Sequence, residues 1–333
     1  MSKVQCELCP RGCILSPGQR GDCRVRENIG GELRTLVYGK PCAVHVDPME
    51  KKPLFHFLPG APVLSIATAG CNLHCRYCQN WDISQRPPEE TNNFDLPPEK
   101  VVAMAVENRC PAIAYTYNDP VVYYEYASDT AKLARGKGIK NVLVTAGYIN
   151  EEPLKELCSM ADAAHVDLKG DDQFYREVCS GTLAPVQRTI EIMKKSGVWV
   201  EVINLVVPTL NDSPDKVRWL AKWLFDSVGP DVPLHFSRFH PIYRLKNLPP
   251  TPVDALLKAR EIAREVGMRY VYVGNVPGLE SENTFCPKCA KAVIKRRAYF
   301  IEENNIKNGA CAFLSKPFSI KELLQTVTTA LEN

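Results

Sequence analysis

The sequence lacks the features that would place the protein in a membrane or on a nucleic acid. None of its apolar runs approaches the ~20 residues that a membrane-spanning helix needs. Residues 1–6 lack the apolar core of a secretory signal peptide. The formal net charge is only +3 and the basic residues are scattered, which gives no nucleic-acid footprint. These absences predict a soluble cytoplasmic protein that binds neither membranes nor nucleic acids.

Cysteine, in contrast, is abundant. The chain has 14 cysteines in 333 residues, of which 45% are hydrophobic. In a short secreted chain such a number would suggest disulfides, but clustered cysteines in a larger cytosolic chain favour metal ligands or catalytic groups. The length suits one large domain, or one with appendages, with a well-buried core.

Three of the cysteines directly follow an apolar run. Cys71, Cys75 and Cys78 have the spacing C-x3-C-x2-C and come after residues 62–68. A strand that ends in such a loop can direct three thiolates at one metal centre. Cubane iron–sulfur clusters usually take four cysteine ligands, and no cysteine follows this group until Cys110. Three ligands would leave one iron free to bind a small molecule.

The alternative for these three cysteines is a structural zinc knuckle or a set of buried free thiols. Zinc sites usually close with four ligands, commonly from two C-x2-C-like halves separated by a loop. The missing fourth ligand therefore favours a cluster over zinc.

A second group of cysteines lies near the N-terminus, with glycines and prolines between its members. Four thiolates in so small a polar segment can close a tetrahedral zinc site or hold a further cluster. A metal-free loop is disfavoured because the segment has little core of its own. The spacing predicts a second metal of open identity, held by Cys6, Cys9, Cys13 and Cys23.

From residue 61 onward, apolar strands alternate with amphipathic helices. Such alternation predicts an α/β fold with a parallel sheet and helices outside it, in which the chemistry lies at the carboxyl ends of the strands. The predicted strands are 62–67, 111–117, 141–146, 163–168, 199–206, 233–238 and 270–274. The predicted helices are 98–109, 121–136, 151–160, 185–196, 214–227 and 252–266.

The segment before the first of these strands predicts a short hairpin. Its two strands are expected at 32–38 and 42–46, and a proline-rich loop then leads into the barrel. We expect a cysteine-rich segment with its hairpin over 1–60, the barrel over 61–280 and a C-terminal appendage over 281–333.

The cysteine trio, with Tyr77 before its last member, resembles the signature of the radical S-adenosylmethionine (radical SAM) enzymes. The string D-P-x-E-K-K-P-L-x-H-F-x-P-G at 47–60, with C-x-L-C-P-R-x-C at 6–13, resembles the radical SAM enzyme of the AmmeMemoRadiSam system. That family is related to the pyruvate formate-lyase activating enzymes. The resemblance covers roughly residues 4–310 and implies a partial (β/α)6 TIM-like barrel, a [4Fe–4S] cluster on the trio and SAM as cofactor.

The resemblance also implies residues that bind SAM. Asn118 and Asp119 stand where the family binds the amino group, although an aspartate before proline is equally a helix N-cap. Asp167 and Lys169 share one face of a strand, and the matching pair of the activating enzymes lies against the methionyl part of SAM. The alternative there is an internal ion pair.

Three further residues are candidates for contacts with SAM: Tyr77, Asn204 and His240. A satisfied core amide is an equal alternative for Asn204, and a surface or core position is a comparable one for His240.

The C-terminal tail departs from the family. Cys286, Cys289 and Cys311 would form part of a zinc ribbon, but Leu314 stands where the fourth ligand is expected. Residues 308–333 resemble the last strand and helix of a response-regulator receiver domain without its acidic pocket. We expect an amphipathic helix there without a phosphorelay function.

The implied activity is reductive cleavage of SAM to a 5′-deoxyadenosyl radical that abstracts hydrogen from an unknown substrate. In related activating enzymes the substrate is a glycine of a partner protein. The resemblance implies a one-electron donor such as flavodoxin or ferredoxin, and Memo-like and AMMECR-like partner proteins. The competing hypothesis is a non-catalytic zinc-binding scaffold. The sequence does not identify the hydrogen donor, the fate of SAM or the oligomeric state.

Overall fold

The computed structural model describes residues 2–307 and 310–311, and the chain divides into two compact units. Unit 1 comprises Met1–Asp47, Pro62–Val198 and Pro241–Leu248. Unit 2 comprises Pro48–Ala61, Trp199–His240 and the chain from Pro249 onward. The predicted boundaries after residues 60 and 280 remain a prediction.

Unit 1 is built on parallel strands that are adjacent in the order of the chain. Strand β6 pairs with β7, β7 with β8 and β8 with β9, all parallel. All four residues of β7 are buried, as expected of a parallel strand covered on both faces. The strands are β6 (Pro62–Ala67), β7 (Ala112–Tyr115), β8 (Lys140–Thr145) and β9 (Ala163–Asp167), with β5 (Ala43–Pro48) beside β6.

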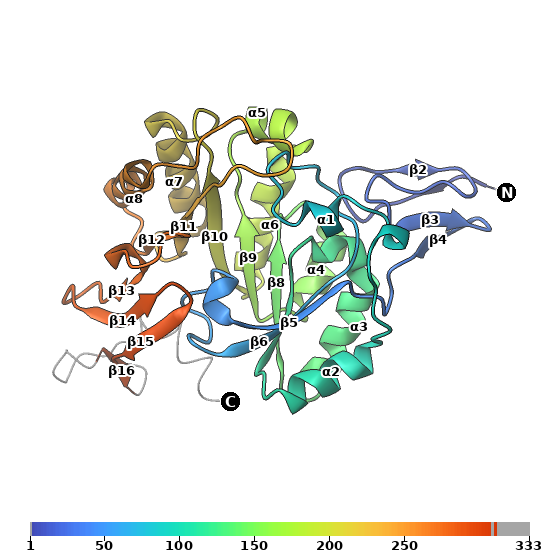
Figure 1. Ribbon diagram of the computed structural model, residues 1–333, viewed down its shortest axis with the longest axis horizontal. Coiled ribbons are helices and arrows are strands. Elements are labelled where there is room, and N and C mark those ends of the chain that lie inside the picture. Colours follow the sequence, from blue (N-terminus) through green and yellow to red (C-terminus); the bar gives the residue numbers. More distant parts are fainter. Residues whose placement is uncertain (1, 308–309, 312–333) are drawn as a thin grey trace. The chain divides into compact units, whose positions relative to one another are not determined.

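Helices alternate with these strands (Figure 1). In α3, the buried residues Tyr126, Ala127, Thr130, Ala131 and Ala134 recur at helical spacing on one face. The helices of unit 1 are α1 (Trp81–Ser84), α2 (Pro98–Glu107), α3 (Tyr124–Arg135), α4 (Glu151–Cys158), α5 (Asp172–Phe174) and α6 (Leu183–Lys195). Shorter 3-10 turns cover Pro88–Glu90 and Pro120–Tyr123, and a π turn covers Tyr175–Cys179.

The N-terminal segment has short antiparallel pairs. Strands β1 (Val4–Gln5) and β2 (Ile14–Leu15) form one pair, and β3 (Arg26–Ile29) and β4 (Glu32–Thr35) form the other. The predicted hairpin at 32–38 and 42–46 was wrong. The turn lies instead at Gly30 and Gly31, whose φ angles are 66° and 92°. A two-residue hairpin loop needs such positive φ angles, which glycine adopts more easily than residues with a side chain.

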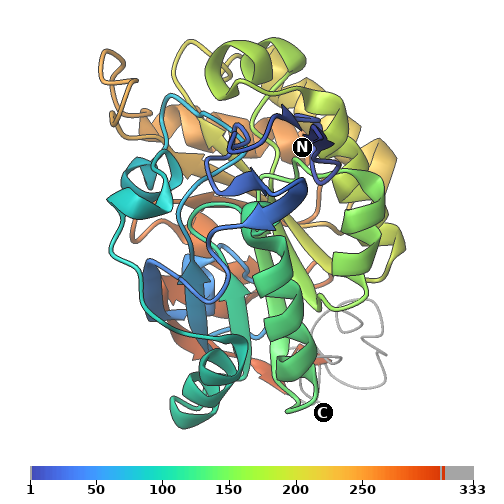
Figure 2. The same cartoon turned by 90° about the vertical axis from the view of Figure 1, so that its right-hand side faces the viewer.

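This N-terminal segment lies against two helices of unit 1 (Figure 2). Arg26 forms an ion pair of 2.5 Å with Glu125 in α3. The backbone N–H of Asn150, the residue before α4, donates to the carbonyl oxygen of Leu8 at 3.1 Å. The segment therefore packs against α3 and the start of α4 in unit 1.

Unit 2 contains three parallel strands and a small antiparallel sheet. Ser213 caps α7 by accepting from the N–H of Lys216, and Gly267, with φ of 114°, ends α8. The parallel strands are β10 (Trp199–Val206), β11 (Leu234–Arg238) and β12 (Val271–Gly274), with α7 (Pro214–Val228) and α8 (Val253–Val266). The antiparallel strands are β13 (Thr284–Phe285), β14 (Ala292–Arg297) and β15 (Phe300–Asn304), followed by the pair β16 (Ile306–Lys307) and β17 (Ala310–Cys311). Met49–Lys51 and Glu280–Glu282 form 3-10 turns.

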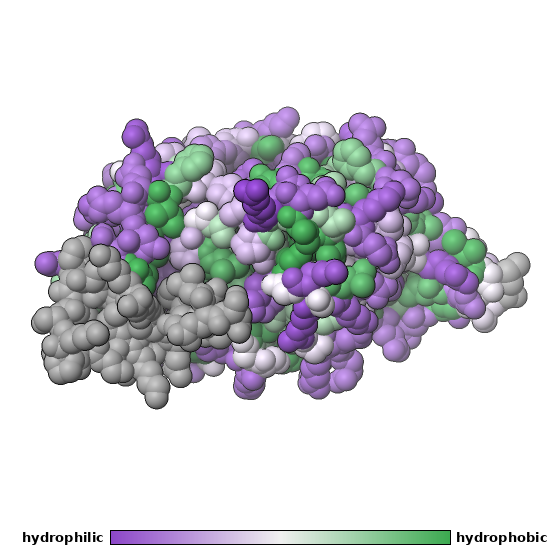
Figure 3. Space-filling view, turned by 90° about the horizontal axis from the view of Figure 1, so that it is seen from below, coloured by the Kyte–Doolittle hydropathy of each residue, from purple (hydrophilic) through white to green (hydrophobic). Residues whose placement is uncertain are grey.

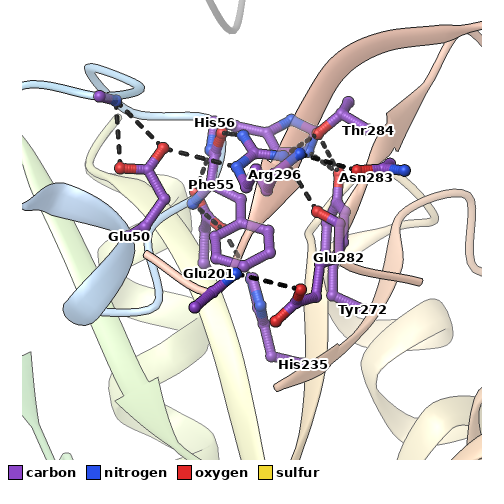
Figure 4. A network of polar contacts seen from close by, with 12 residues as sticks. Glu50, Phe55, His56, Glu201, His235, Tyr272, Glu282, Asn283, Thr284 and Arg296 are labelled. Atoms are coloured by element: carbon purple, nitrogen blue, oxygen red, sulfur yellow. Dashed lines mark hydrogen bonds and ion pairs between the residues drawn. The ribbon is translucent and has the colours of Figure 1, made fainter. Parts of the chain in front are cut away.

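A buried polar network joins distant segments of unit 2 (Figure 4). The side chains of Arg296 and Glu50 are both 0% exposed and lie 3.5 Å apart. Arg296 also donates to the carbonyl oxygen of Phe55 at 2.6 Å, and its guanidinium lies 4.3 Å from the centre of the Phe55 ring. Glu201 and His235 form a second buried pair, at 2.7 Å. These contacts attach the segment from Pro48 to Ala61 to the rest of unit 2.

The surface shown in Figure 3 has hydrophobic residues in small separate groups among hydrophilic ones. In the part of the chain that the structure describes, no helix has the length and apolarity to span a membrane. The predicted receiver-like tail, residues 308–333, lies outside the described residues apart from β17, and so do the side chain of Cys311 and residue Leu314.

Candidate functional site

The loop that carries Cys71, Cys75 and Cys78 begins at the carboxyl end of β6. Gly70 has a φ of 84°, and a Cβ atom there would lie 2.4 Å from the carbonyl oxygen of Cys23 and 2.6 Å from Cγ1 of Val25. Only glycine fits this position, because the loop backs directly onto the N-terminal segment. The start of the loop that carries the three thiols is thus held in place by close packing against the N-terminal segment.

The three thiols are shielded from water. Cys75 is buried, and Cys71 and Cys78 are half-buried. The N–H of Leu73 points at Sγ of Cys71 at 3.5 Å, and Oγ of Ser84 lies 3.1 Å from Sγ of Cys78. Burial raises the pKa of Cys78 to about 11 and that of Cys71 well above its usual value. A metal bound here would have to displace the thiol protons.

A fourth cysteine lies beside the trio, and sequence reasoning missed it. Cys179 is fully buried and makes a hydrogen bond with Cys75 that raises the pKa of Cys75. The hydroxyl of Tyr77 lies 3.7 Å from Sγ of Cys179. The backbone N–H of His74 donates to the carbonyl oxygen of Cys179 at 2.9 Å. No motif marks Cys179, because its position depends on contacts about a hundred residues apart in the sequence.

Asn118 and Asp119 both lie at this loop, with different environments. Nδ2 of Asn118 donates to the carbonyl oxygens of Thr68 and Gly70 at 2.8 Å each. Among the described residues, none donates to the buried Oδ1 of Asn118. Asp119 instead uses both of its carboxylate oxygens on the protein, accepting from Val121, Thr145 and Ala146. Burial raises the pKa of Asp119 to about 6. Asp119 therefore has the N-cap contact that was its alternative interpretation.

Asp167 and Lys169 are joined at the end of β9. Nζ of Lys169 lies 2.7 Å from Oδ2 of Asp167, and Nε2 of His165 lies 2.9 Å from Oδ1. Burial alone would lower the pKa of Lys169, but the carboxylate of Asp167 holds it well above its usual value. The internal ion pair, which was the alternative interpretation of these two residues, is present. His165 was not predicted, although its position two residues before Asp167 places it on the same strand face.

Of the remaining candidates, only Tyr77 lies on the loop of the trio. Asn204 is buried in β10 of unit 2, and His240 is an exposed residue of unit 2 after β11. Tyr77 is buried in unit 1, and its ring centre lies 6.0 Å from that of Phe174. The four N-terminal cysteines Cys6, Cys9, Cys13 and Cys23 line a separate cavity of unit 1 together.

The residues of unit 1 fit a cluster that also binds an amino acid. Three thiols withdrawn from water, one of them already accepting from a backbone N–H, suit an anionic iron–sulfur centre. The buried Oδ1 of Asn118 needs a donor, and an ammonium group is such a donor. The ammonium of Lys169 supplies positive charge close to Cys75.

Comparison with known proteins gives matches over most of the chain. Residues 65–224 match the family model described as the radical SAM superfamily. An uncharacterised protein of Methanocaldococcus jannaschii is 50% identical over 295 residues, which cover 89% of this chain and 88% of that protein. The pyruvate formate-lyase-activating enzyme of Clostridium pasteurianum is 24% identical over 162 residues, which cover 46% of this chain and 65% of that enzyme.

Among solved structures, that of a radical SAM methyltransferase from Sphaerobacter thermophilus has a TM-score of 0.51 at 16% identity, covering 68% of this chain and 71% of that one. At this identity the likeness shows the fold alone. The predicted fold class, an α/β partial barrel with parallel strands and a cysteine-rich N-terminal segment, is confirmed.

Proposed function

Because this chain belongs to the radical SAM superfamily, we propose that it cleaves SAM reductively and removes a hydrogen atom from a residue of a partner protein. Membership of the superfamily implies a [4Fe–4S] cluster and SAM as cofactors. Cys71, Cys75 and Cys78 would hold the cluster. When bound, the reduced cluster supplies the electron that splits SAM into methionine and a 5′-deoxyadenosyl radical, which abstracts the hydrogen.

One observation carries this proposal: a loop with three shielded thiols lies directly beside a buried acceptor that no described residue satisfies. The donations from Asn118 to the carbonyl oxygens of Thr68 and Gly70 fix its side chain against the loop. Its Oδ1 is then the acceptor for the ammonium of SAM. Lys169, oriented by Asp167, is the cation for the carboxylate of SAM.

Other residues of unit 1 keep water away from the site. Tyr77 and Cys179 are buried next to Cys75, so the side of the loop that they cover is dry. Asp119 receives three donors from the chain and holds the start of the turn Pro120–Tyr123. Its contribution is to position Asn118, its neighbour in the sequence. Exclusion of water protects a reactive carbon radical from side reactions.

The proposed partner and electron donor follow from the similarity of this chain to an activating enzyme. The relative from Clostridium pasteurianum is a pyruvate formate-lyase-activating enzyme, which supports a protein substrate for this chain. We propose flavodoxin or ferredoxin as the one-electron donor. Proteins that resemble Memo and AMMECR are the proposed partners, and the cytoplasm is the proposed compartment.

The test is anaerobic reconstitution with iron and sulfide, followed by SAM and dithionite, with 5′-deoxyadenosine as the measured product. We expect product from the wild type and none from Cys75→Ala, whose iron content falls while its fold is retained. Cys110→Ala is the matched control, because Cys110 is also buried but precedes β7, at the opposite end of the strands from the loop. Product and iron at wild-type levels in Cys75→Ala would refute the assignment.

The same preparation distinguishes the cluster enzyme from the competing zinc scaffold. A zinc scaffold would be colourless and hold zinc, whereas a cluster enzyme is brown and bleaches when dithionite is added. Adding candidate partner proteins then tests the finer proposal. Faster formation of 5′-deoxyadenosine with one partner, together with hydrogen transfer from it, is the expected result.

A further inference from the structure

The four cysteines near the N-terminus line one cavity of unit 1, although the first and last of them, Cys6 and Cys23, are 17 positions apart in the sequence. Cys6 and Cys9 are buried, and Cys13 and Cys23 are half-buried. Both Sγ of Cys13 and Sγ of Cys23 lie 3.8 Å from the point where Gly21 would carry a Cβ atom. The hydrophobic side of the cavity is formed by Leu8, Val121 and Val122.

The four thiols are not arranged as the ligands of a single metal ion. In a zinc site the Zn–S bonds are ~2.3 Å, which brings the four sulfurs to within about 3.8 Å of each other. Among the described residues, no group of three or more cysteine, histidine or acidic side chains is close enough to share one ion. The trio at Cys71, Cys75 and Cys78 is spread in the same way, and thiolates around a cubane each bind a different iron.

Two arginines line the cavity, of which Arg11 is already paired with Asp22 at 3.0 Å. Arg26 is only 5% exposed, and it lines the cavity together with Arg11. One end of its guanidinium is paired with Glu125 at 2.5 Å. No described residue accepts from its buried Nε, and leaving such a donor unsatisfied is costly. An anionic centre with sulfide and thiolate sulfurs provides the missing acceptor.

The cavity also touches the loop of the first site. Asn72, which follows Cys71, is part of its lining, and its carbonyl oxygen accepts from Nε of Arg11 at 2.9 Å. Cys23 contacts Gly70 through its backbone. The cavity of the N-terminal cysteines therefore borders the loop that carries Cys71.

We propose that Cys6, Cys9, Cys13 and Cys23 hold a second [4Fe–4S] cluster, next to the loop of the first, with Arg26 as its charge partner. Four cysteine ligands leave no open iron, so this cluster cannot bind SAM. Its chemistry is limited to accepting and donating single electrons.

The decisive experiment leaves the N-terminal cysteines intact. A Cys71→Ser/Cys75→Ser/Cys78→Ser variant of the full chain is prepared without oxygen and assayed for iron, sulfide and zinc. We expect about eight irons per chain in the wild type and about four in this variant, with the absorption of a cubane cluster retained. A variant with Cys286→Ser and Cys289→Ser is the matched control, and it should keep the iron content of the wild type.

Each outcome separates this proposal from the function proposed above. About four irons in the wild type and none in the triple variant would refute the second cluster alone. One zinc per chain in the triple variant would also refute it. No iron in either protein would overturn both. If the triple variant keeps its iron, Cys9→Ser/Cys13→Ser added to it should remove that iron.

The role of Arg26 has its own test in the triple-variant background. Replacing Arg26 by methionine removes a cation beside the cluster, so we expect a more negative midpoint potential in a dye-monitored reductive titration. Arg20→Met is the control, because Arg20 pairs with Glu27 and Glu89 at the surface. An unchanged potential in Arg26→Met would refute its assignment as the charge partner.

Discussion

Replacing Arg296 by methionine should strongly destabilise unit 2. The substitution keeps much of the side-chain volume but leaves Glu50 as a buried carboxylate without its cationic partner. Breaking a fully buried ion pair in this way costs about 3–5 kcal/mol. The free energy of unfolding should fall by at least that amount. The substitution also removes the hydrogen bonds from Arg296 to Phe55 and Thr284.

The adjacent residue supplies the control. Lys295 lies on the same strand, and its ion pair with Glu303 is 45% and 51% exposed on the two sides. Exposed pairs contribute about 0–1 kcal/mol, so Lys295→Met should leave the stability almost unchanged. Urea unfolding of the metal-free protein, followed by tryptophan fluorescence, measures both variants. Three of the four tryptophans, at 199, 219 and 223, lie in unit 2.

The pH dependence tests the physical cause. Burial already raises the pKa of Glu50 in the wild type, and loss of Arg296 should raise it further. A raised pKa in the folded state means that stability is lost as the pH rises through it, because the charged form is the disfavoured one. The deficit of Arg296→Met should therefore be greatest near pH 8 and shrink toward pH 5. In the double variant with Glu50→Gln, the total cost should be below the sum of the two single costs.

A cost below about 1 kcal/mol, or equal to that of Lys295→Met, would refute this reasoning. So would a deficit that does not change between pH 5 and pH 8. The second result would mean that the hydrogen bond and packing of Arg296 at Phe55, rather than its charge, hold the segment in place.

Three further predictions concern single side chains. In urea unfolding, Gly70→Ala should lower the unfolding free energy by at least ~2 kcal/mol more than Gly138→Ala. Both positions have a positive φ, but only at Gly70 would the added Cβ collide with a backbone oxygen. Equal costs would contradict the close contact. Burial lowers the pKa of His56 to about 4 from 6.5, so its contribution to stability is lost as the pH falls from about 6.5 to 4, by about 3 kcal/mol. His56→Gln should flatten the melting temperature over that range, and a slope like that of the wild type would argue against it. Asn118→Leu should weaken SAM binding by about 10- to 100-fold in equilibrium dialysis at unchanged iron content, since it removes an acceptor for a charged donor; unchanged affinity would remove Asn118 from the site.

Much of the fold could be read from the sequence because apolar runs and helix caps are local signals. The predicted strand at 199–206 coincides with β10, and the predicted helix at 214–227 differs from α7 by one residue. The hairpin was misplaced because its turn lies at Gly30 and Gly31, before the more apolar stretch 32–46 in which both strands were predicted. The end of that stretch belongs to β5, which instead lies beside β6.

The site was predictable only where its residues form a motif. The trio on one loop and the pair at Asp167 and Lys169 are spaced by local geometry, so their types and intervals were visible. Cys179 carries no such spacing, whereas His165 lies two residues before Asp167, at the same interval, and was overlooked. Glu50 and Arg296 are 246 residues apart, and their pairing follows from the topology of unit 2 alone. Each of these contacts depends on the fold being complete.

The close contact between Gly70 and Cys23 has a consequence for handling the protein in air. Cys23 and Val25 pack directly against Gly70, at the start of the loop that carries the trio. A protein shortened to begin after residue 25 would open that side of the loop to dissolved dioxygen. Any cluster absorption of this shortened protein, which keeps every cysteine of the trio, should fade within a shorter exposure than that of a full chain that carries Cys9→Ser/Cys13→Ser.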